Sequence, residues 1–305
     1  MRHAAGHHEL LNEVVFQTES VRVGRFRCPV GYREFAHCGR PRSHLVAFPR
    51  SSVWIHSMRS RPFVADPGVA TIYNPGDEYE RSPISPDGDR CEYFGVSEDI
   101  ALAIAEELEP AGRRASGREV FAIAYMPVEL ALYAHQRAVY AGIRRGEIEP
   151  LEAEEQVIAI VAATVAGRGM RRVQAPASGN TDEVHKDLAM RAKAVLSRDL
   201  AEPVSVTALA NELGASPYHL CRVFRRQVGT TLHRYRLELR VRAALERIAR
   251  PGADLSEVAL ELGFSSHSHF TTVIRQRLGM PPSAARSLLR TVAPPGPATR
   301  ARDQS

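Results

Sequence analysis

The chain has 305 residues, with 40 lysines and arginines against 35 aspartates and glutamates, and 44% of its residues are hydrophobic. This length and composition allow about two domains with their own cores. No run of about 18 apolar residues occurs, so we expect no membrane span, and residues 1–10 lack the apolar core of a secretion signal. The four cysteines form no Cys-x-x-Cys pair, which predicts reduced thiols and a cytoplasmic location.

The charge is distributed unevenly along the chain. Residues 185–290 contain 17 lysines and arginines against 9 acidic residues, whereas residues 1–184 contain 21 against 25. The net charges are therefore +8 and −4, and the tail from residue 291 adds +1. This asymmetry indicates that the C-terminal part, and not the N-terminal part, contacts a polyanion.

The N-terminal part, residues 1–96, has the pattern of short β-strands. Four segments are rich in β-branched and aromatic residues, and Gly/Pro turns such as 66–68, 74–77 and 85–89 separate the strands. Many short strands with such turns predict a compact barrel or sandwich. The four segments are 21–26, 44–48, 52–56 and 69–73.

Residues 97–167 change to helical spacing, with a short helix over 99–108 and two longer ones over 128–145 and 151–166. The two longer helices form a predicted hairpin, which either provides a dimer contact or covers the core of the strand-rich part. Residues 168–182 are rich in Gly, Ala, Pro and Ser and are expected to be a linker. Residues 291–305 are expected to be a disordered tail.

A predicted helix-turn-helix begins at Ser205, which is placed as the N-cap of a helix over 206–213. Gly214 can adopt the left-handed conformation of the turn, and Ser216-Pro217 starts a second helix. In that second helix Leu220, Val223 and Phe224 face the core, which leaves a basic outer face. A basic outer face of this kind is typical of a helix that enters the DNA major groove.

The unit then repeats. Ala210, Leu213 and Gly214 recur 49 residues later as Ala259, Leu262 and Gly263. A long helix over 232–248 separates the units, and at 1.5 Å per residue it spans ~25 Å or more. It could hold two recognition helices about one DNA turn apart.

The repeated motifs resemble those of the AraC/XylS family of transcription regulators. They are Ala208-Leu-Ala-x-x-Leu-Gly-x-Ser-x-x-x-Leu-x-Arg-x-Phe224, Val258-Ala-x-x-Leu-Gly-Phe-Ser-Ser-x-Ser-His-Phe270 and Gly279-x-x-Pro282. The resemblance covers about a third of the chain and implies a seven-helix DNA-binding domain over 183–290. It also implies an N-terminal cupin-like sensor, so the expected fold class is α+β.

By the same resemblance, one face of each recognition helix reads base edges. Three positions depart from the family pattern: Thr272 stands where arginine is usual, Ile274 replaces an aromatic residue, and Ala285 replaces the tyrosine that Tyr235 represents in the first unit. The implied base-reading residues are Tyr218, Cys221 and Arg222 in the first unit and His267, Ser268, Thr271 and Thr272 in the second. The implied phosphate contacts are Arg225, Arg226, Arg275 and Arg277.

The strand-rich part offers weaker candidates. Cys28, His37, Cys38 and His44 have ligand chemistry for zinc, but their spacing matches no metal motif, so we predict no metal and no cofactor. Cys28 and Cys91 could be redox-sensitive thiols or packed core. Arg50, Arg81 and Arg90 could meet an anionic effector or lie on the solvated surface. Five aromatic side chains could line an effector pocket or pack as core: Trp54, Phe63, Tyr73, Tyr79 and Phe94.

These observations favour a sequence-specific transcription regulator that responds to a small-molecule effector and has no catalytic residues. Activator is the working expectation, and the sequence leaves activation and repression both open. Its expected partners are double-stranded DNA, the effector, RNA polymerase and a second copy of the chain, with no membrane. Two alternatives are a metal- or thiol-based sensor joined to the DNA-binding units and a cupin enzyme joined to them.

Overall fold

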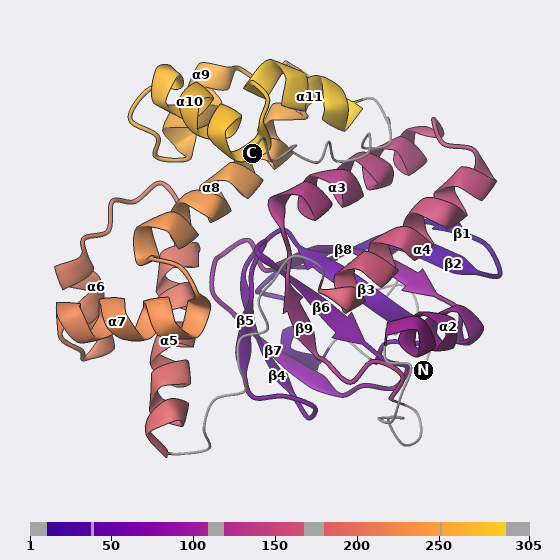
Figure 1. Ribbon diagram of the computed structural model, residues 1–305, viewed down its shortest axis with the longest axis horizontal. Coiled ribbons are helices and arrows are strands. Elements are labelled where there is room, and N and C mark those ends of the chain that lie inside the picture. Colours follow the sequence, from indigo (N-terminus) through magenta and orange to yellow (C-terminus); the bar gives the residue numbers. More distant parts are fainter. Residues whose placement is uncertain (1–10, 38–39, 109–118, 168–179, 251, 291–305) are drawn as a thin grey trace, which may run out of the picture.

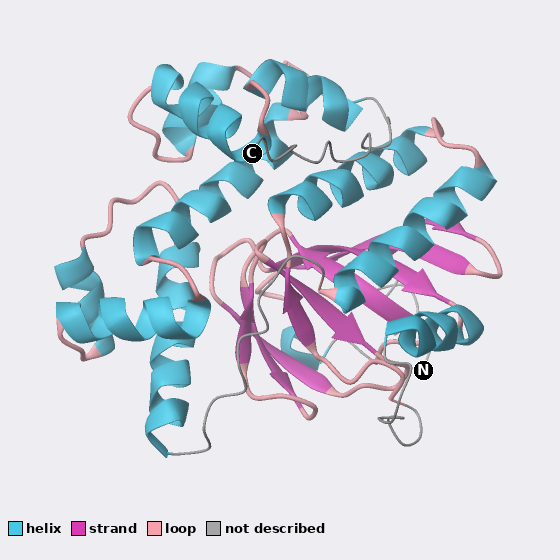
Figure 2. Cartoon of the chain, in the orientation of Figure 1, coloured by secondary structure: helices cyan, strands magenta, loops and turns pink. Residues whose placement is uncertain are grey.

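The computed structural model describes residues 11–37, 40–108, 119–167, 180–250 and 252–290. A strand-rich N-terminal part and a helical C-terminal part lie against each other (Figures 1 and 2). The α+β class is therefore confirmed. Most of the predicted linker and the whole predicted tail, as well as Cys38, fall outside the described residues.

The N-terminal part contains two antiparallel sheets. The larger has six strands in the order β1-β2-β8-β3-β6-β9, the smaller has the order β5-β4-β7, and no pairing between described strands joins the two. The prediction of a strand-rich N-terminal part is therefore confirmed, but its described strands form two separate sheets and not the closed barrel that was expected. The strands are β1 (Asn12–Gln17), β2 (Val21–Cys28), β3 (His44–Pro49), β4 (Val53–Ser57), β5 (Phe63–Ala65), β6 (Val69–Tyr73), β7 (Tyr79–Pro83), β8 (Asp89–Val96) and β9 (Tyr125–Pro127). A short 3-10 helix, η1 (Phe35–His37), follows β2.

The segment over 97–167 is not purely helical, which corrects the sequence prediction. Strand β9 pairs with β6, with Met126 opposite Ala70, and so forms one edge of the larger sheet. Three residues are too few for a period-two pattern to be recognised in the sequence. The segment also contains the helices α2 (Glu98–Leu108), α3 (Leu130–Arg145) and α4 (Pro150–Ala166).

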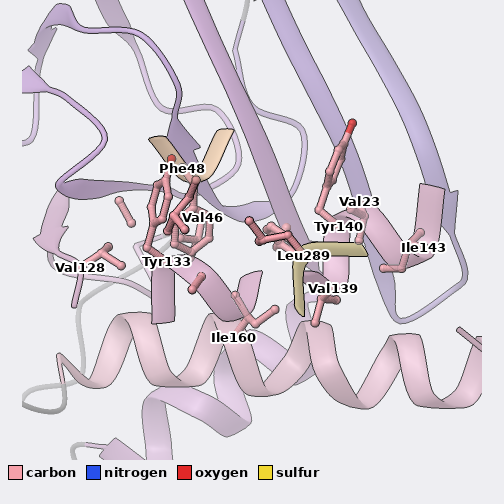
Figure 3. Close-up of a cluster of buried hydrophobic side chains, with 14 of the residues drawn as sticks. Val23, Val46, Phe48, Val128, Tyr133, Val139, Tyr140, Ile143, Ile160 and Leu289 are labelled. Atoms are coloured by element: carbon pink, nitrogen blue, oxygen red, sulfur yellow. The ribbon is translucent and has the colours of Figure 1, made fainter. Parts of the chain in front are cut away.

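The α3–α4 hairpin packs against the larger sheet. Figure 3 shows Tyr133 of α3 close to Val46 and Phe48 of β3, and Val139 of α3 and Ile160 of α4 belong to the same cluster. These five side chains are buried in one hydrophobic cluster. The sequence left two roles open for this hairpin, and the structure shows one of them, because the hairpin covers the core of the strand-rich part. The dimer contact stays a prediction.

The C-terminal part contains seven described helices, the number that the resemblance implies. They are α5 (Asn180–Arg198), α6 (Val206–Leu213), α7 (Pro217–Val228), α8 (Leu232–Ile248), α9 (Leu255–Glu261), α10 (His267–Leu278) and α11 (Pro282–Arg290). The first of them begins at residue 180, inside the segment predicted as linker. No described helix of the chain is long and apolar enough to cross a membrane.

Helix α8 connects the two helical units. Tyr235 and Leu239 belong to the hydrophobic cluster that contains Leu220 and Phe224 of α7. Farther along, Val241 and Leu245 belong to the cluster that contains Phe270 of α10. One rigid helix therefore contributes to both cores and sets the distance between α7 and α10 (Figure 1).

Candidate nucleic-acid interface

The turn between α6 and α7 is formed by local backbone chemistry. The hydroxyl of Ser205 accepts a hydrogen bond from the Ala208 amide at 3.1 Å, and that of Ser216 accepts one from the His219 amide at 3.2 Å. Gly214 ends α6 with a φ of 69° and open space around it. A glycine adopts this left-handed conformation without the strain that a Cβ would bring. These caps fix the direction in which α7 leaves the turn.

Helix α7 has one buried face and one exposed polar face. Leu220, Val223 and Phe224 are buried, and the predicted base-reading residues lie on the opposite face. Tyr218 is 78% exposed, and Cys221 and Arg222 are also exposed. The structure therefore places all three predicted residues of the first unit on one accessible helix face.

The second recognition helix, α10, is less uniform. His267, Ser268 and Thr272 are exposed. Thr271, however, is half-buried, and its hydroxyl oxygen is inaccessible and has no hydrogen-bond partner among the described residues. A base contact from Thr271 therefore stays a prediction, and it requires the hydroxyl to become accessible. Two residues before Thr271 lies an exposed residue that the sequence prediction did not include: His269, whose Nδ1 is 3.0 Å from the Ser265 hydroxyl oxygen.

Three of the predicted phosphate-binding arginines are exposed, Arg225 and Arg226 on α7 and Arg275 on α10. Arg222, Arg225 and Arg275 form no ion pair in the described part of the chain. Arg277 differs, because its Nη1 lies 3.2 Å from a carboxylate oxygen of Glu238 on α8. Its charge is partly neutralised within the domain, so Arg275 is the better phosphate contact of the second unit.

The five aromatic residues predicted for an effector pocket take part in several separate ring contacts, and their role in binding an effector stays a prediction. Phe94 packs edge-on against Phe48 in the large-sheet cluster, and Phe63 stacks on Tyr125 with ring centroids 4.1 Å apart. Tyr73 and Tyr79 contact each other at 4.8 Å, and Trp54 is half-buried near His56. The stacking partner Tyr125 comes from β9, which the sequence did not predict.

Two of the three arginines considered for an anionic effector are buried, so a place on the solvated surface is wrong for them. Arg81 Nη1 lies 2.5 Å from Asp89, and its guanidinium covers the Phe26 ring at 4.8 Å. Burial raises the pKa of Asp89 more than Arg81 lowers it. Arg50 is held in a buried ion cluster described below, whereas Arg90 is half-buried.

The thiols and imidazoles of the strand-rich part do not form a metal centre in the described residues. No group of three or more His, Cys, Asp or Glu side chains lies close enough there to hold an ion. Cys28 is buried with its Sγ directed at the Pro29 carbonyl oxygen, and burial raises the pKa of the Cys91 thiol well above its usual range. A raised pKa suppresses the reactive thiolate, which disfavours Cys91 as a redox sensor.

The comparisons with known proteins concern mainly the helical part. A family model described as a helix-turn-helix domain matches residues 209–287. The transcriptional regulator GlxA of Rhizobium meliloti is 35% identical over 28% of this chain and 27% of its own length. The bifunctional transcriptional activator and DNA repair enzyme AdaA of Bacillus subtilis is 26% identical over 30% of this chain and 44% of its own length. The chain thus spans less than half the length of these relatives.

Among solved structures, an AraC-type regulator from Chromobacterium violaceum is 25% identical and covers 36% of this chain and 99% of its own, with a TM-score of 0.34. The C-terminal part of the chain thus contains a helix-turn-helix domain over residues 209–287. ToxT from Vibrio cholerae covers 90% of this chain and 100% of its own at 11% identity, with a TM-score of 0.34. The matched residues contain both α7 and α10, so both exposed helix faces belong to the matched region.

Proposed function

We propose that this protein is a sequence-specific DNA-binding transcription regulator whose strand-rich part senses a small molecule. One observation carries the proposal: two helix-turn-helix units present exposed polar faces on α7 and α10 and share the rigid helix α8. Two recognition helices fixed to one rod can enter successive major grooves, which defines a bipartite site. The net charge of +8 over 185–290 provides the attraction to phosphates.

The division of labour follows the packing. We assign sensing to residues 11–167, because β9 and the α3–α4 hairpin complete the sheet and its core, and DNA binding to residues 180–290. Double-stranded DNA and a small-molecule effector are the proposed partners, and contacts with RNA polymerase and with a second copy remain predictions. The relatives named as regulators support a non-enzymatic role, and we propose no catalytic residue for this chain.

The test uses the full-length protein and DNA selected from a random library. We expect a defined site, and the logarithm of the binding constant should fall linearly with the logarithm of salt concentration, with a slope of about −0.9 per phosphate neutralised. Arg222→Ala and Arg275→Ala should each weaken binding. Arg25→Ala is the matched control, because Arg25 is an exposed arginine of β2 paired with Glu13. Selection of no sequence, or equal losses in all three variants, would refute the proposal.

A further inference from the structure

A large crevice lies between the strand-rich part and the helix-turn-helix domain. Its volume is about 1420 Å³, and its walls come from β2, the loop after β3, the end of α3, the segment that follows α5, and α8. Ten arginines line the crevice against seven carboxylates. Four of these arginines form no ion pair within the described residues: Arg27, Arg90, Arg144 and Arg250. The crevice is therefore electropositive and is accessible to a small anion.

One wall of the crevice contains a buried ion cluster that joins the two parts of the protein. Glu92 of β8 accepts hydrogen bonds from Arg50, which follows β3, and from Arg137 of α3. Both arginines also meet Glu246 of α8, whose Oε1 lies 2.7 Å from Arg137 Nε and 3.4 Å from Arg50 Nε. The Tyr133 hydroxyl donates to the same Glu246 oxygen at 3.1 Å. A carboxylate of the DNA-binding domain thus occupies an arginine pair of the sensor.

The fit of Glu246 to this pair is incomplete. The Nε atoms of Arg50 and Arg137 lie within ion-pair distance of Glu246, yet neither is hydrogen-bonded. Arg50 Nη1 also has no hydrogen-bond partner, and water cannot readily replace one because the Arg50 side chain is only 5% exposed. Buried donors without partners cost free energy, and a guanidinium fork is satisfied best by a planar or tetrahedral oxyanion that accepts two bonds at once. Arg50 and Arg137 therefore keep three buried donors that Glu246 does not satisfy.

We propose that the crevice binds a small molecule bearing a carboxylate or phosphate, which displaces Glu246 from Arg50 and Arg137. The inference rests on the proposed function and identifies the place and chemical class of the effector. A carboxylate that replaces Glu246 leaves the charge beside the two arginines unchanged, whereas a phosphate monoester makes it more negative. No bond is made or broken, so the step is a competition between two carboxylate-like ligands.

The exchange has a consequence for DNA binding because of where Glu246 lies. Helix α8 contributes to the cores of both helix-turn-helix units, and Glu246 lies near its C-terminal end. While Glu246 is held by Arg50 and Arg137, α8 is fixed against α3. Release of Glu246 removes that restraint, so the anion and DNA become thermodynamically linked through the position of α8.

The experiment uses the full-length protein and three named probes, benzoate, citrate and glucose 6-phosphate, with benzamide and glucose as neutral counterparts. Binding is measured by calorimetry up to about 10 mM, the range of weak site-specific affinity. We expect at least one oxyanion to bind and neither neutral compound to do so. Glu246→Gln should strengthen oxyanion binding about tenfold, because the internal competitor is gone. Arg137→Gln should abolish it.

Glu238→Gln is the matched control. Glu238 lies on the same helix and also contacts two arginines, Arg242 and Arg277, but it does not line the crevice. The oxyanion affinity of the Glu238→Gln variant should equal that of the unmodified chain. Thermal melting of every variant establishes that it is folded.

DNA affinity supplies the second readout. Without any probe, the Glu246→Gln variant should have the DNA affinity that the unmodified chain reaches at saturating probe. Adding a probe to the variant should not change that affinity. Two outcomes would overturn this inference and leave the proposed function standing. One is that the unmodified chain binds DNA but none of the oxyanions. The other is that the Glu246→Gln and Glu238→Gln variants bind oxyanions with equal affinity. Absence of DNA binding in the unmodified chain would instead overturn the proposed function.

Discussion

The Tyr235 hydroxyl donates a hydrogen bond of 2.8 Å to the carboxylate of Asp66, although the two residues are 169 positions apart. Asp66 belongs to the turn between β5 and β6, and Tyr235 belongs to α8. The same carboxylate oxygen lies 2.8 Å from Lys193 Nζ of α5, and Asp66 is fully buried. This contact joins the strand-rich part to the first helix-turn-helix unit, as the Glu246 cluster joins it to the end of α8.

Asp66→Ala should destabilise the protein far more than Tyr235→Phe. Loss of Asp66 leaves the Lys193 ammonium buried without its partner, which costs about 3–5 kcal/mol. Tyr235→Phe removes one hydrogen bond while Asp66 keeps Lys193, which costs about 1–1.5 kcal/mol. Urea unfolding of the full-length chain measures both values. In a fragment over 180–290 Tyr235→Phe should have no such cost, because Asp66 is absent, and an equal loss in the fragment would contradict this assignment.

The two helix-turn-helix units should contribute unequally to sequence preference. Arg222 is exposed on α7 and can donate two parallel hydrogen bonds to guanine, a contact that separates bases by ~1–3 kcal/mol. Its counterpart on α10 is Thr272, which cannot make that fork. Arg222→Ala should erase base preference in one half-site of a binding-site selection, whereas Thr272→Ala should change affinity little. The reverse ranking would mean that α10 reads bases through other side chains, such as His269.

The two turn glycines, which the sequence repeat pairs, should differ in their tolerance of alanine. Both have a positive φ, 69° at Gly214 and 73° at Gly263, so a Cβ costs about 1–2 kcal/mol at either position. At Gly214 the Cβ would meet open space, but at Gly263 it would lie 2.8 Å from the Ala201 carbonyl oxygen. Gly263→Ala should therefore lower the melting temperature more than Gly214→Ala. Equal losses would argue against the close approach of residue 201.

The thiols should react in an order set by exposure and pKa. Cys221 is exposed on the proposed base-reading face of α7, Cys28 is buried, and burial raises the pKa of Cys91. Among these three, a maleimide reagent followed by peptide mapping should label Cys221 first, and bound DNA should protect it. The modified protein should lose DNA affinity, whereas a Cys221→Ala variant treated in the same way should keep it. Faster labelling of Cys91 than of Cys221 would support the alternative hypothesis of a thiol-based sensor.

Two histidines of the strand-rich part should make stability depend on pH. Burial lowers the pKa of His44 and that of His135 below the usual 6.5. As pH falls below that value, the unfolded chain takes up protons that the folded chain does not, so stability is fully present above 6.5 and is lost at lower pH. The free energy of unfolding should fall between about pH 7 and pH 5. A His44→Gln, His135→Gln double variant should flatten this slope, and an unchanged slope in that variant would contradict the assignment.

Local patterns predicted much of the fold and the first recognition face. Helix α8 begins and ends where its spacing indicates, and the serine caps and Gly214 position α7 as predicted, because each depends on residues a few positions apart. The residues of the ion cluster could not be predicted in this way. Arg50, Glu92 and Glu246 come from distant segments, and a charged residue in isolation has the pattern of a solvated surface. Their pairing is a property of tertiary packing alone.

The position of β9 determines where the strand-rich part can be cut. Tyr125, Met126 and Pro127 lie opposite Thr71, Ala70 and Val69, so β6 is an interior strand only while residues 125–127 are present. A fragment ending at residue 108 would leave β6 with a row of unpaired backbone donors and acceptors beside apolar side chains. Such an open edge invites strand addition from another molecule, and self-association of that fragment would reflect the lost strand and not a native dimer.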